Sequence, residues 1–409
     1  MILEKNRLSQ SLVQPHAAGA GASRENVFFH LFKASWLLAL LLLLLNLGTV
    51  AGLGNINALE KSLFMVAGLI YLANKPLNWG PTISALIILL TIFICAFFTR
   101  FFSFSWGRTA SAVTALFALV PFFLARPSER ERNLALKSLA LVPFVLVLYG
   151  VALWMATGNP IIFRDHTGAQ RLGGALHPAF LAAASYAGAL SSAFLYSQHR
   201  SFRYLFFCAA SIVICLLSGT RMPSVCAVAS CALVIVGATR GGASRVGIIG
   251  LGLAAAVIFL MTFGDQILVR FMSGSTSGRE DMWAVLNEWV VRYPLVGVGF
   301  GHHGLLIPES ITKLTRTSAA HNEYLRSLVE LGYLGAPVFL AGLFLLFVQS
   351  SANSFSKITF QTLALVLLVF IYASTDNVFF LSYSLLIALV ISWAPPAPMP
   401  SHGQSAAKP

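Results

Sequence analysis

The stretch SWLLALLLLLLNLGTVAGL, residues 35–53, carries no charged side chain and decides what kind of protein this chain forms. It is longer than the apolar core of a secretory signal peptide, which has about 7–15 residues. Its length matches the roughly 20 residues that a helix needs to cross a bilayer. Because similar apolar segments follow it along the chain, we interpret it as a first membrane-spanning helix and not as a cleaved leader.

The composition of the whole chain agrees with this interpretation. Hydrophobic residues make up 57% of the chain and charged residues only 10%, against about 25% charged residues in soluble proteins. The formal net charge of +13 comes from basic residues that stand singly between apolar runs. They form no basic face, so nucleic acid is not an expected partner. The five cysteines all lie in apolar segments, which favours small buried side chains over disulfides.

Apolar segments of about 20 residues, bounded by charges or turn residues, predict an all-α polytopic membrane protein with about twelve spans. The predicted spans lie near residues 35–53, 58–74, 81–99, 109–125, 134–156, 177–197, 204–219, 223–238, 246–263, 333–350, 359–375 and 378–395. The predicted division of the chain is a disordered arm (1–33), helices one to nine (34–263), a catalytic loop (264–332), helices ten to twelve (333–395) and a disordered tail (396–409).

The distribution of arginines predicts the orientation and an anionic ligand. Twelve spans place both termini on one face, together with the basic turns 126–132 and 240–245, so this face should be cytoplasmic. The other face carries the long loop and the single arginines Arg100, Arg108, Arg164, Arg171 and Arg221. Arginines on an outer face fit binding of an anion. For the first four, side chains that reach lipid phosphates fit equally well.

The interval from Gly264 to Gly335 is the one long part of the chain that is rich in charge, so we expect the chemistry there. Ser277 and Glu280 have the spacing of a capping box, which places Arg279 in the first turn of a helix. A cation at this positive end of the helix dipole is unfavourable unless an anion binds beside it. Pairing of Arg279 with Asp265 or Asp281 is the alternative.

Three histidines lie in the same interval. The segment from Ala320 to Gly335 has the pattern of an amphipathic helix that runs into the tenth predicted span, with His321 at its start. The positive end of the dipole disfavours a protonated imidazole, so His321 could accept a proton. A histidine that only caps the helix is the alternative. His302 and His303 are adjacent, which does not suit metal binding, and we expect loop residues near the membrane surface.

Several of these motifs together resemble the O-antigen ligase family. The resemblance rests on His321-Asn322 followed by Gly332 and Gly335, on Gly278-Arg279 with Trp283, on Pro294–Gly299 and on the turn Ser218-Gly219-Thr220-Arg221. The predicted topology, twelve spans with one large periplasmic loop, is also similar to that of this family. O-antigen polymerases and protein O-glycan ligases share parts of the pattern.

The resemblance implies a glycosyltransferase of the GT-C type in the bacterial inner membrane, active at its periplasmic face in lipopolysaccharide biosynthesis. It would transfer a glycan from undecaprenyl pyrophosphate to the lipid A-core, with Arg221 and Arg279 on the pyrophosphate and His321 on the acceptor hydroxyl. Asn322, Arg100, Arg108 and Arg164 are expected to contact substrate, and neither metal nor cofactor is expected. The alternatives are an O-antigen polymerase, a protein O-glycan ligase, or a transporter or flippase of lipid-linked glycans. The scarcity of carboxylates in the predicted spans argues against transport.

Overall fold

The protein is helical and built as a membrane protein. The computed structural model describes residues 17–45, 56–164, 170–239, 279–315, 317–355, 359–379 and 382–394. Seven helices in these ranges are long and apolar enough to cross a membrane. Three shorter apolar helices join them. The predicted all-α polytopic fold class is therefore confirmed, whereas the number of twelve spans stays a prediction.

The helices lie where the apolar runs predicted them. The helices are α1 (Ala17–Leu45), α3 (Ile56–Leu72), α4 (Trp79–Phe98), α5 (Trp106–Phe117), α6 (Glu129–Thr157), α7 (Pro178–His199), α8 (Phe202–Leu217), α9 (Arg221–Ala238), α11 (Arg279–Arg292), α12 (Glu309–Thr315), α13 (Glu323–Phe355), α14 (Phe360–Ala373) and α15 (Ser382–Ser392), with short 3-10 turns η1 (Val120–Phe123) and η2 (His303–Leu305). Eleven of the twelve predicted segments overlap helices in this set, although residues 46–53 of the first lie outside the described residues and the fourth, 109–125, is divided between α5 and η1. The ninth segment, 246–263, lies outside the described residues, as do the predicted tail 396–409 and residues 264–278 of the predicted loop.

The N-terminal arm differs from its prediction. Residues 17–33 were expected to be disordered, but α1 begins at Ala17 and its apolar candidate span begins at Glu25. Residues 17–22 read AAGAGA, in which four alanines favour a helix and two glycines disfavour it, so propensity alone does not account for this extension. The helix nevertheless extends beyond the part that composition marks as membrane-spanning.

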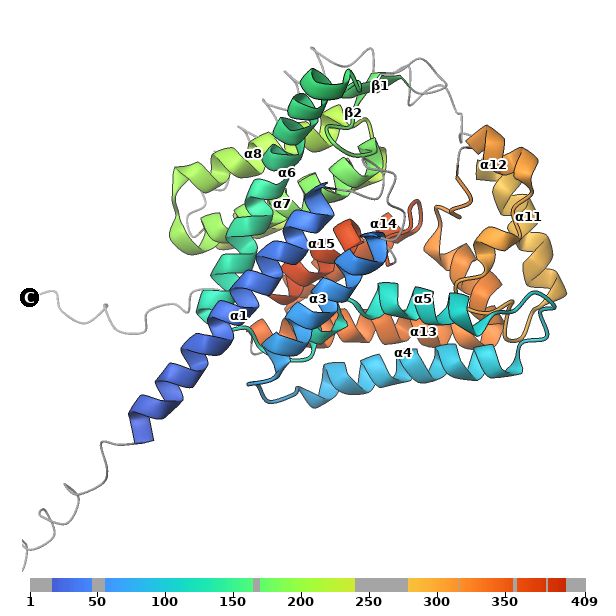
Figure 1. Ribbon diagram of the computed structural model, residues 1–409, viewed down its shortest axis with the longest axis horizontal. Helices are drawn as coiled ribbons and strands as arrows, with labels where there is room; N and C mark the ends of the chain where they lie inside the picture. The colour runs from blue at the N-terminus through green and yellow to red at the C-terminus, as the bar shows by residue number, and fades with distance from the viewer. Residues whose placement is uncertain are drawn as a thin grey trace, which may run out of the picture.

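A short antiparallel hairpin interrupts the helical chain before α7. Its strands are β1 (Ile162–Arg164) and β2 (Gln170–Leu172), with Ile162 opposite Leu172. In Figure 1 this hairpin lies beyond the end of α6, and α11 and α12 lie together near one end of α13. The helices α4, α5 and α13 run side by side in the same view.

Two features hold the helices in register. The first is an aromatic cluster: Trp36 of α1, Phe122 of η1 and Trp393 after α15 are fully buried and pack together with Tyr71 of α3. The second is α7, which is rich in alanine and serine and is buried along most of its length against α6, α8, α9 and α15. Small residues allow close approach: a Cβ at Gly188 would lie 2.6 Å from Pro143 Cγ.

A kink in α13 receives the glycine-rich segment 294–299. Gly332 has φ 66° and ψ −175°, so the helix breaks there. The amides of Tyr333 and Leu334 donate to the carbonyls of Pro294 and Leu295, at 2.7 and 3.1 Å. In the other direction, the amide of Val298 donates to Val329 O at 2.9 Å. Backbone groups that the kink would leave unpaired are thereby satisfied.

Candidate active site

The candidate active site lies where several helices begin. Arg221 is the first residue of α9, Arg279 is the first residue of α11, and His321 precedes the start of α13. His177 caps α7, its Nδ1 accepting from the amide of Ala179 at 3.3 Å. Helix starts present a positive dipole end and amide N–H groups, so their convergence favours a negatively charged ligand.

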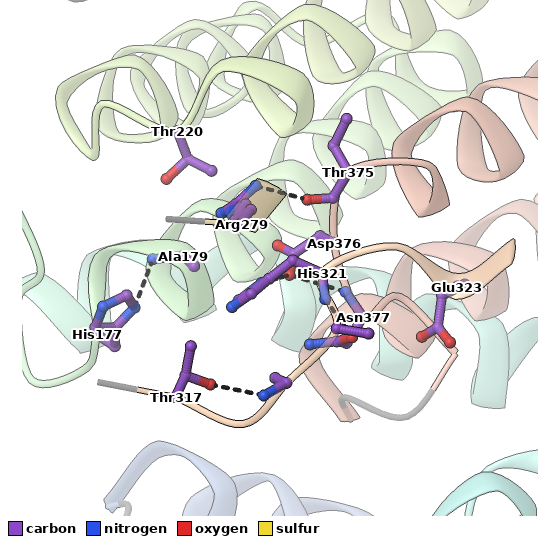
Figure 2. A network of polar contacts seen from close by, with 12 residues as sticks. His177, Ala179, Thr220, Arg279, Thr317, His321, Glu323, Thr375, Asp376 and Asn377 are labelled. Atoms are coloured by element: carbon purple, nitrogen blue, oxygen red, sulfur yellow. Dashed lines mark hydrogen bonds and ion pairs between the residues drawn. The ribbon is translucent and has the colours of Figure 1, made fainter. Parts of the chain in front are cut away.

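His321 and Asp376 form a hydrogen-bonded pair across 55 residues of sequence. Nδ1 of His321 lies 3.2 Å from Oδ1 of Asp376, and Figure 2 shows the pair within a polar network. The Asp376 carboxylate is fixed on both oxygens, because Oδ1 accepts from the amide of Asn377 at 2.8 Å and Oδ2 from the Tyr372 hydroxyl at 3.1 Å. The carboxylate that binds the His321 imidazole is therefore itself fixed by two hydrogen bonds.

The backbone of His321 is fixed by the same turn. His321 has φ 50°, an unusual conformation for a residue other than glycine. Its amide donates to Oδ1 of Asn377 at 3.1 Å. Residues 376 and 377 thus bind both the main chain and the ring of His321. Strained backbone that its surroundings hold in place is characteristic of functional sites.

The pair has a defined electrostatic state. Burial alone would raise the pKa of the Asp376 carboxyl, but the hydrogen bond and charge of His321, the Asn377 amide and Arg279 outweigh it and lower that pKa. An ionised carboxylate accepts a hydrogen bond from the protonated Nδ1 of the neutral imidazole. Nε2 is then the ring nitrogen that carries the lone pair. This arrangement suits a general base.

Arg279 lies on the other side of this carboxylate. Its Nη1 donates to the carbonyl of Thr375, the neighbour of Asp376, at 3.2 Å. Burial lowers the pKa of Arg279, the charge of Asp376 raises it and that of Arg221 lowers it. The two arginines predicted to act together are thus close enough to repel each other, and guanidinium groups remain charged at neutral pH. An anion between them would relieve the repulsion.

The turn that carries Arg221 is held by another arginine. Gly219 has φ 65°. Arg171 of β2 donates from Nε to Ser218 O and from Nη2 to Thr220 Oγ1, both at 2.9 Å. Figure 2 shows Thr220, the residue before Arg221, on the same side of the network as Arg279. Arg171 therefore positions the start of α9.

The remaining predicted arginines do not join this network. Arg100 is exposed in the loop between α4 and α5, and Arg164 is exposed on β1. Arg108, on α5, lines a separate cavity with Lys61 and Arg326. Asn322 caps α13, since its Oδ1 accepts from the amides of Tyr324 and Leu325 at 3.0 and 3.1 Å. Substrate contacts by these four residues stay predictions.

The adjacent histidines differ from their predicted position at the membrane surface. His302 is fully buried, stacked on Phe104, and its Nε2 accepts from the amide of Ser105 at 2.9 Å. Nδ1 of His303 lies 2.6 Å from Oε1 of Glu330 on α13. The glycine-rich loop folds inward against the kink of α13 and carries both rings into the protein, which local sequence does not show.

Sequence reasoning missed Asp376, Asn377 and His177, and it placed Arg171 on the outer face without predicting its bonds to the turn before Arg221. Asp376 and Asn377 form a short polar break between two apolar runs, and that break was the available signal. Burial and the charges of Arg171 and His321 lower the pKa of His177, against the effect of Asp376, so this ring belongs to the same electrostatic environment. Within the described ranges, no three or more His, Cys, Asp or Glu residues are grouped as a metal site would require.

Comparison with known proteins gives a match to a family model. The family model described as O-antigen ligase matches residues 205–340. The matched interval contains Arg221, Arg279 and His321, but ends before Asp376. No curated protein matches the chain. The match confirms the resemblance to the O-antigen ligase family that the sequence motifs indicated.

Proposed function

From the match to O-antigen ligases, we propose that the protein transfers a whole glycan from undecaprenyl pyrophosphate to a sugar hydroxyl of the lipid A-core. The reaction takes place at the periplasmic face of the bacterial inner membrane, as a step of lipopolysaccharide biosynthesis. Within the described residues, the segment from Arg279 to the kink of α13 serves as the catalytic region, together with the turn at Asp376.

The observation that carries this proposal is the His321–Asp376 pair beside Arg279. Nε2 of His321 takes the proton of the acceptor hydroxyl, whose oxygen forms a bond to the anomeric carbon of the donor glycan. The bond between that carbon and the pyrophosphate oxygen breaks, and its electron pair stays on the pyrophosphate. Asp376 stabilises the imidazolium that forms, as the carboxylate of a catalytic triad does.

Arg221 and Arg279 stabilise the departing charge. Pyrophosphate is a good leaving group, so the site needs fixed cations more than a proton donor. Guanidinium groups can bind phosphate oxygens through two parallel hydrogen bonds. The helix starts that carry both arginines add amide donors. Since these groups supply the required charge, the proposed scheme includes no metal ion.

The identity of the acceptor tests this function. Purified full-length protein would be incubated with a lipid-linked glycan donor, together with equal amounts of lipid A-core and a second lipid-linked glycan. A ligase consumes the lipid A-core and leaves the second lipid-linked glycan unextended. Extension of the lipid-linked glycan would assign the chain to the polymerases instead. Transfer to a protein acceptor, added in a separate reaction, would assign it to the protein O-glycan ligases.

A further inference from the structure

A second site lies among the first turns of α3, α5 and α13. A cavity of about 270 Å³ is lined there by Lys61, Arg108, Ser111 and Arg326, with Gly301 at its wall. Pockets that enclose whole small molecules usually measure about 300–1,000 Å³. The cavity therefore has the size for one small polar group and not for a glycan chain.

The charges that face this cavity have one sign. Lys61, Arg108 and Arg326 come from three helices, and the described residues that line the cavity include no carboxylate. None of the ion pairs recorded between described residues involves Lys61 or Arg108, although Lys61 interacts electrostatically with the adjacent Glu60. Arg326 is paired with Glu330, but Lys61 and Arg108 add positive charge that no carboxylate of the lining offsets, so an anion bound in the cavity is stabilised.

Arg326 is held at the wall of the cavity by a buried network. The residue is 7% exposed, and its Nε lies 3.4 Å from Oε2 of Glu330. Oε1 of the same Glu330 accepts from Nδ1 of His303 at 2.6 Å. The carboxylate of Glu330 thus binds both Arg326 and His303. Lys61 and Arg108 add further positive charge to the cavity. The side chain at the base of the cavity is fixed before any ligand arrives, which lowers the entropic cost of binding.

The cavity and the candidate active site share α13. The amide of Arg326 donates to the carbonyl of Asn322 at 2.9 Å, so Arg326 lies one helical turn beyond the residue that follows His321. The donor arginines belong to other elements, α9 and α11. His321, the proposed general base, therefore lies at the start of α13, the helix that also carries Arg326 of the cavity. Arg221 and Arg279, which face the donor, lie on α9 and α11.

We propose that this cavity binds a phosphate group of the acceptor glycolipid and so presents the acceptor hydroxyl to His321. This inference rests on the proposed ligase function. The pyrophosphate of the donor binds Arg221 and Arg279. A phosphate of the acceptor binds separately to Lys61, Arg108 and Arg326. A phospholipid headgroup offers the same chemistry, so the experiment must distinguish the two sources of phosphate.

The test compares acceptor affinity with and without phosphate. Full-length protein in nanodiscs would be given phosphorylated lipid A-core or the same acceptor after phosphatase treatment, and both binding without donor and steady-state transfer would be measured. The variants are Lys61→Gln and Arg108→Gln. Lys313→Gln is the matched control, since Lys313 is exposed on α12 and paired with Glu309 away from the cavity lining.

The proposal predicts a specific pattern. For wild type and Lys313→Gln, removal of the acceptor phosphate raises Kd and the acceptor KM about tenfold, while the donor KM changes less than about twofold. Each cavity variant raises the KM for phosphorylated acceptor about tenfold, and phosphatase treatment then adds little. Equal affinity of the wild-type protein for both acceptors would overturn the proposal, although transfer would still support the ligase function.

Two further outcomes separate the alternatives. If phosphate strengthens acceptor binding through Lys61 and Arg108 but no glycan is transferred, the ligase function fails and the phosphate site stands. If the defect of the cavity variants appears only in nanodiscs with anionic phospholipid, and phosphatase treatment of the acceptor has no effect, the site belongs to a phospholipid headgroup and the acceptor assignment is wrong.

Discussion

At the scale of single residues, the turn at Asp376 and Asn377 controls His321. Oδ1 of Asp376 lies 3.2 Å from Nδ1 of the His321 ring, and Oδ1 of Asn377 accepts from the backbone amide of His321 at 3.1 Å. Because the ring is attached at Nδ1, Nε2 is the nitrogen available to a substrate. The geometry thus assigns separate duties: Asp376 orients, Asn377 holds the strained backbone, and His321 exchanges the proton.

Asp376→Asn should fold and lose most transfer. The amide side chain can still bond the ring, but it no longer favours a proton on Nδ1 or stabilises the imidazolium, so turnover should fall roughly 10²-fold or more. Steady-state kinetics with saturating donor would measure this. Asp281→Asn, which removes an exposed carboxylate from α11, should retain wild-type rates. A fully active Asp376→Asn protein would remove the carboxylate from the mechanism.

The same substitution predicts how stability depends on pH. The pKa of Asp376 is lowered in the folded state from its ordinary value of 3.8. Its ionised form therefore stabilises the fold at neutral pH, and this contribution is lost as pH falls below the ordinary value towards the folded one. The difference in melting temperature between wild type and Asp376→Asn should shrink as the pH falls below about 4. A constant difference at all pH values would contradict this account.

Arg221→Lys and Arg279→Lys test how the phosphates are bound. Lysine keeps the positive charge but loses the planar two-pronged donor, so each variant should bind donor more weakly and transfer more slowly, by about tenfold or more. Donor binding and transfer would be measured on the same preparations. Wild-type transfer by both lysine variants would reduce these arginines to simple charges.

At the scale of elements, the site depends on the break in α13. Gly332 turns the helix there, and segment 294–299 enters the break with glycines at 297 and 299, at φ 70° and 100°. A Cβ at Gly332 would lie 2.3 Å from Leu295 O. The first turns of α13, which carry Arg326 and follow His321, are therefore set at a fixed angle to the part of the helix beyond the break.

Gly332→Ala should be much more damaging than Gly158→Ala. Both glycines have positive φ, 66° and 75°, but a Cβ at Gly158 meets nothing within 4 Å. Gly158 is in the left-handed helical region, with ψ 0°, where alanine costs about 1 kcal/mol. Gly332 has ψ −175°, a conformation that is nearly restricted to glycine, and an alanine there also clashes with backbone, so Gly332→Ala should cost about 3 kcal/mol or more. Melting temperatures of both purified variants would show the difference. Equal melting temperatures would show that the break is not tightly packed.

Sequence predicted the helices better than it predicted the contacts between them. Long apolar runs determine where helices form, so eleven predicted segments overlap described helices. Arg279 and His321 were recognisable because each is an unusual residue at a helix start. Asp376 was not, because one carboxylate in a short turn lies 55 residues from the ring it binds. The inward fold of His302 and His303 depends on the kink of α13, and no local pattern indicates that packing.

At the scale of the whole molecule, the site gathers at one end of the bundle. The helices α7, α9 and α13 begin there, and α8 and α14 end a few residues before Arg221 and Asp376. With 29 residues, α6 is roughly 43 Å long, which is long enough for its two ends to reach opposite sides of a bilayer. The basic residues at its start, including Arg130, thus lie far from the site.

This arrangement predicts opposite labelling of two introduced thiols. Ser310→Cys on α12 and Arg130→Cys at the start of α6 replace exposed residues. The five native cysteines are free and buried, which keeps the background low. In intact cells, a membrane-impermeant maleimide should label position 310 when it has access to the periplasm and position 130 only after the inner membrane is opened. The reverse pattern would place the site on the cytoplasmic face.

The central claim is that His321 is the base for the acceptor while the arginines hold the donor. The most direct test is single-turnover glycan transfer by purified His321→Ala, with donor affinity and melting temperature measured on the same sample. The account predicts near wild-type donor affinity and a transfer rate lower by roughly 10²-fold or more. A histidine that only supports the helix start predicts about 1 kcal/mol of lost stability with transfer retained. Wild-type transfer by a well-folded His321→Ala protein would contradict the account.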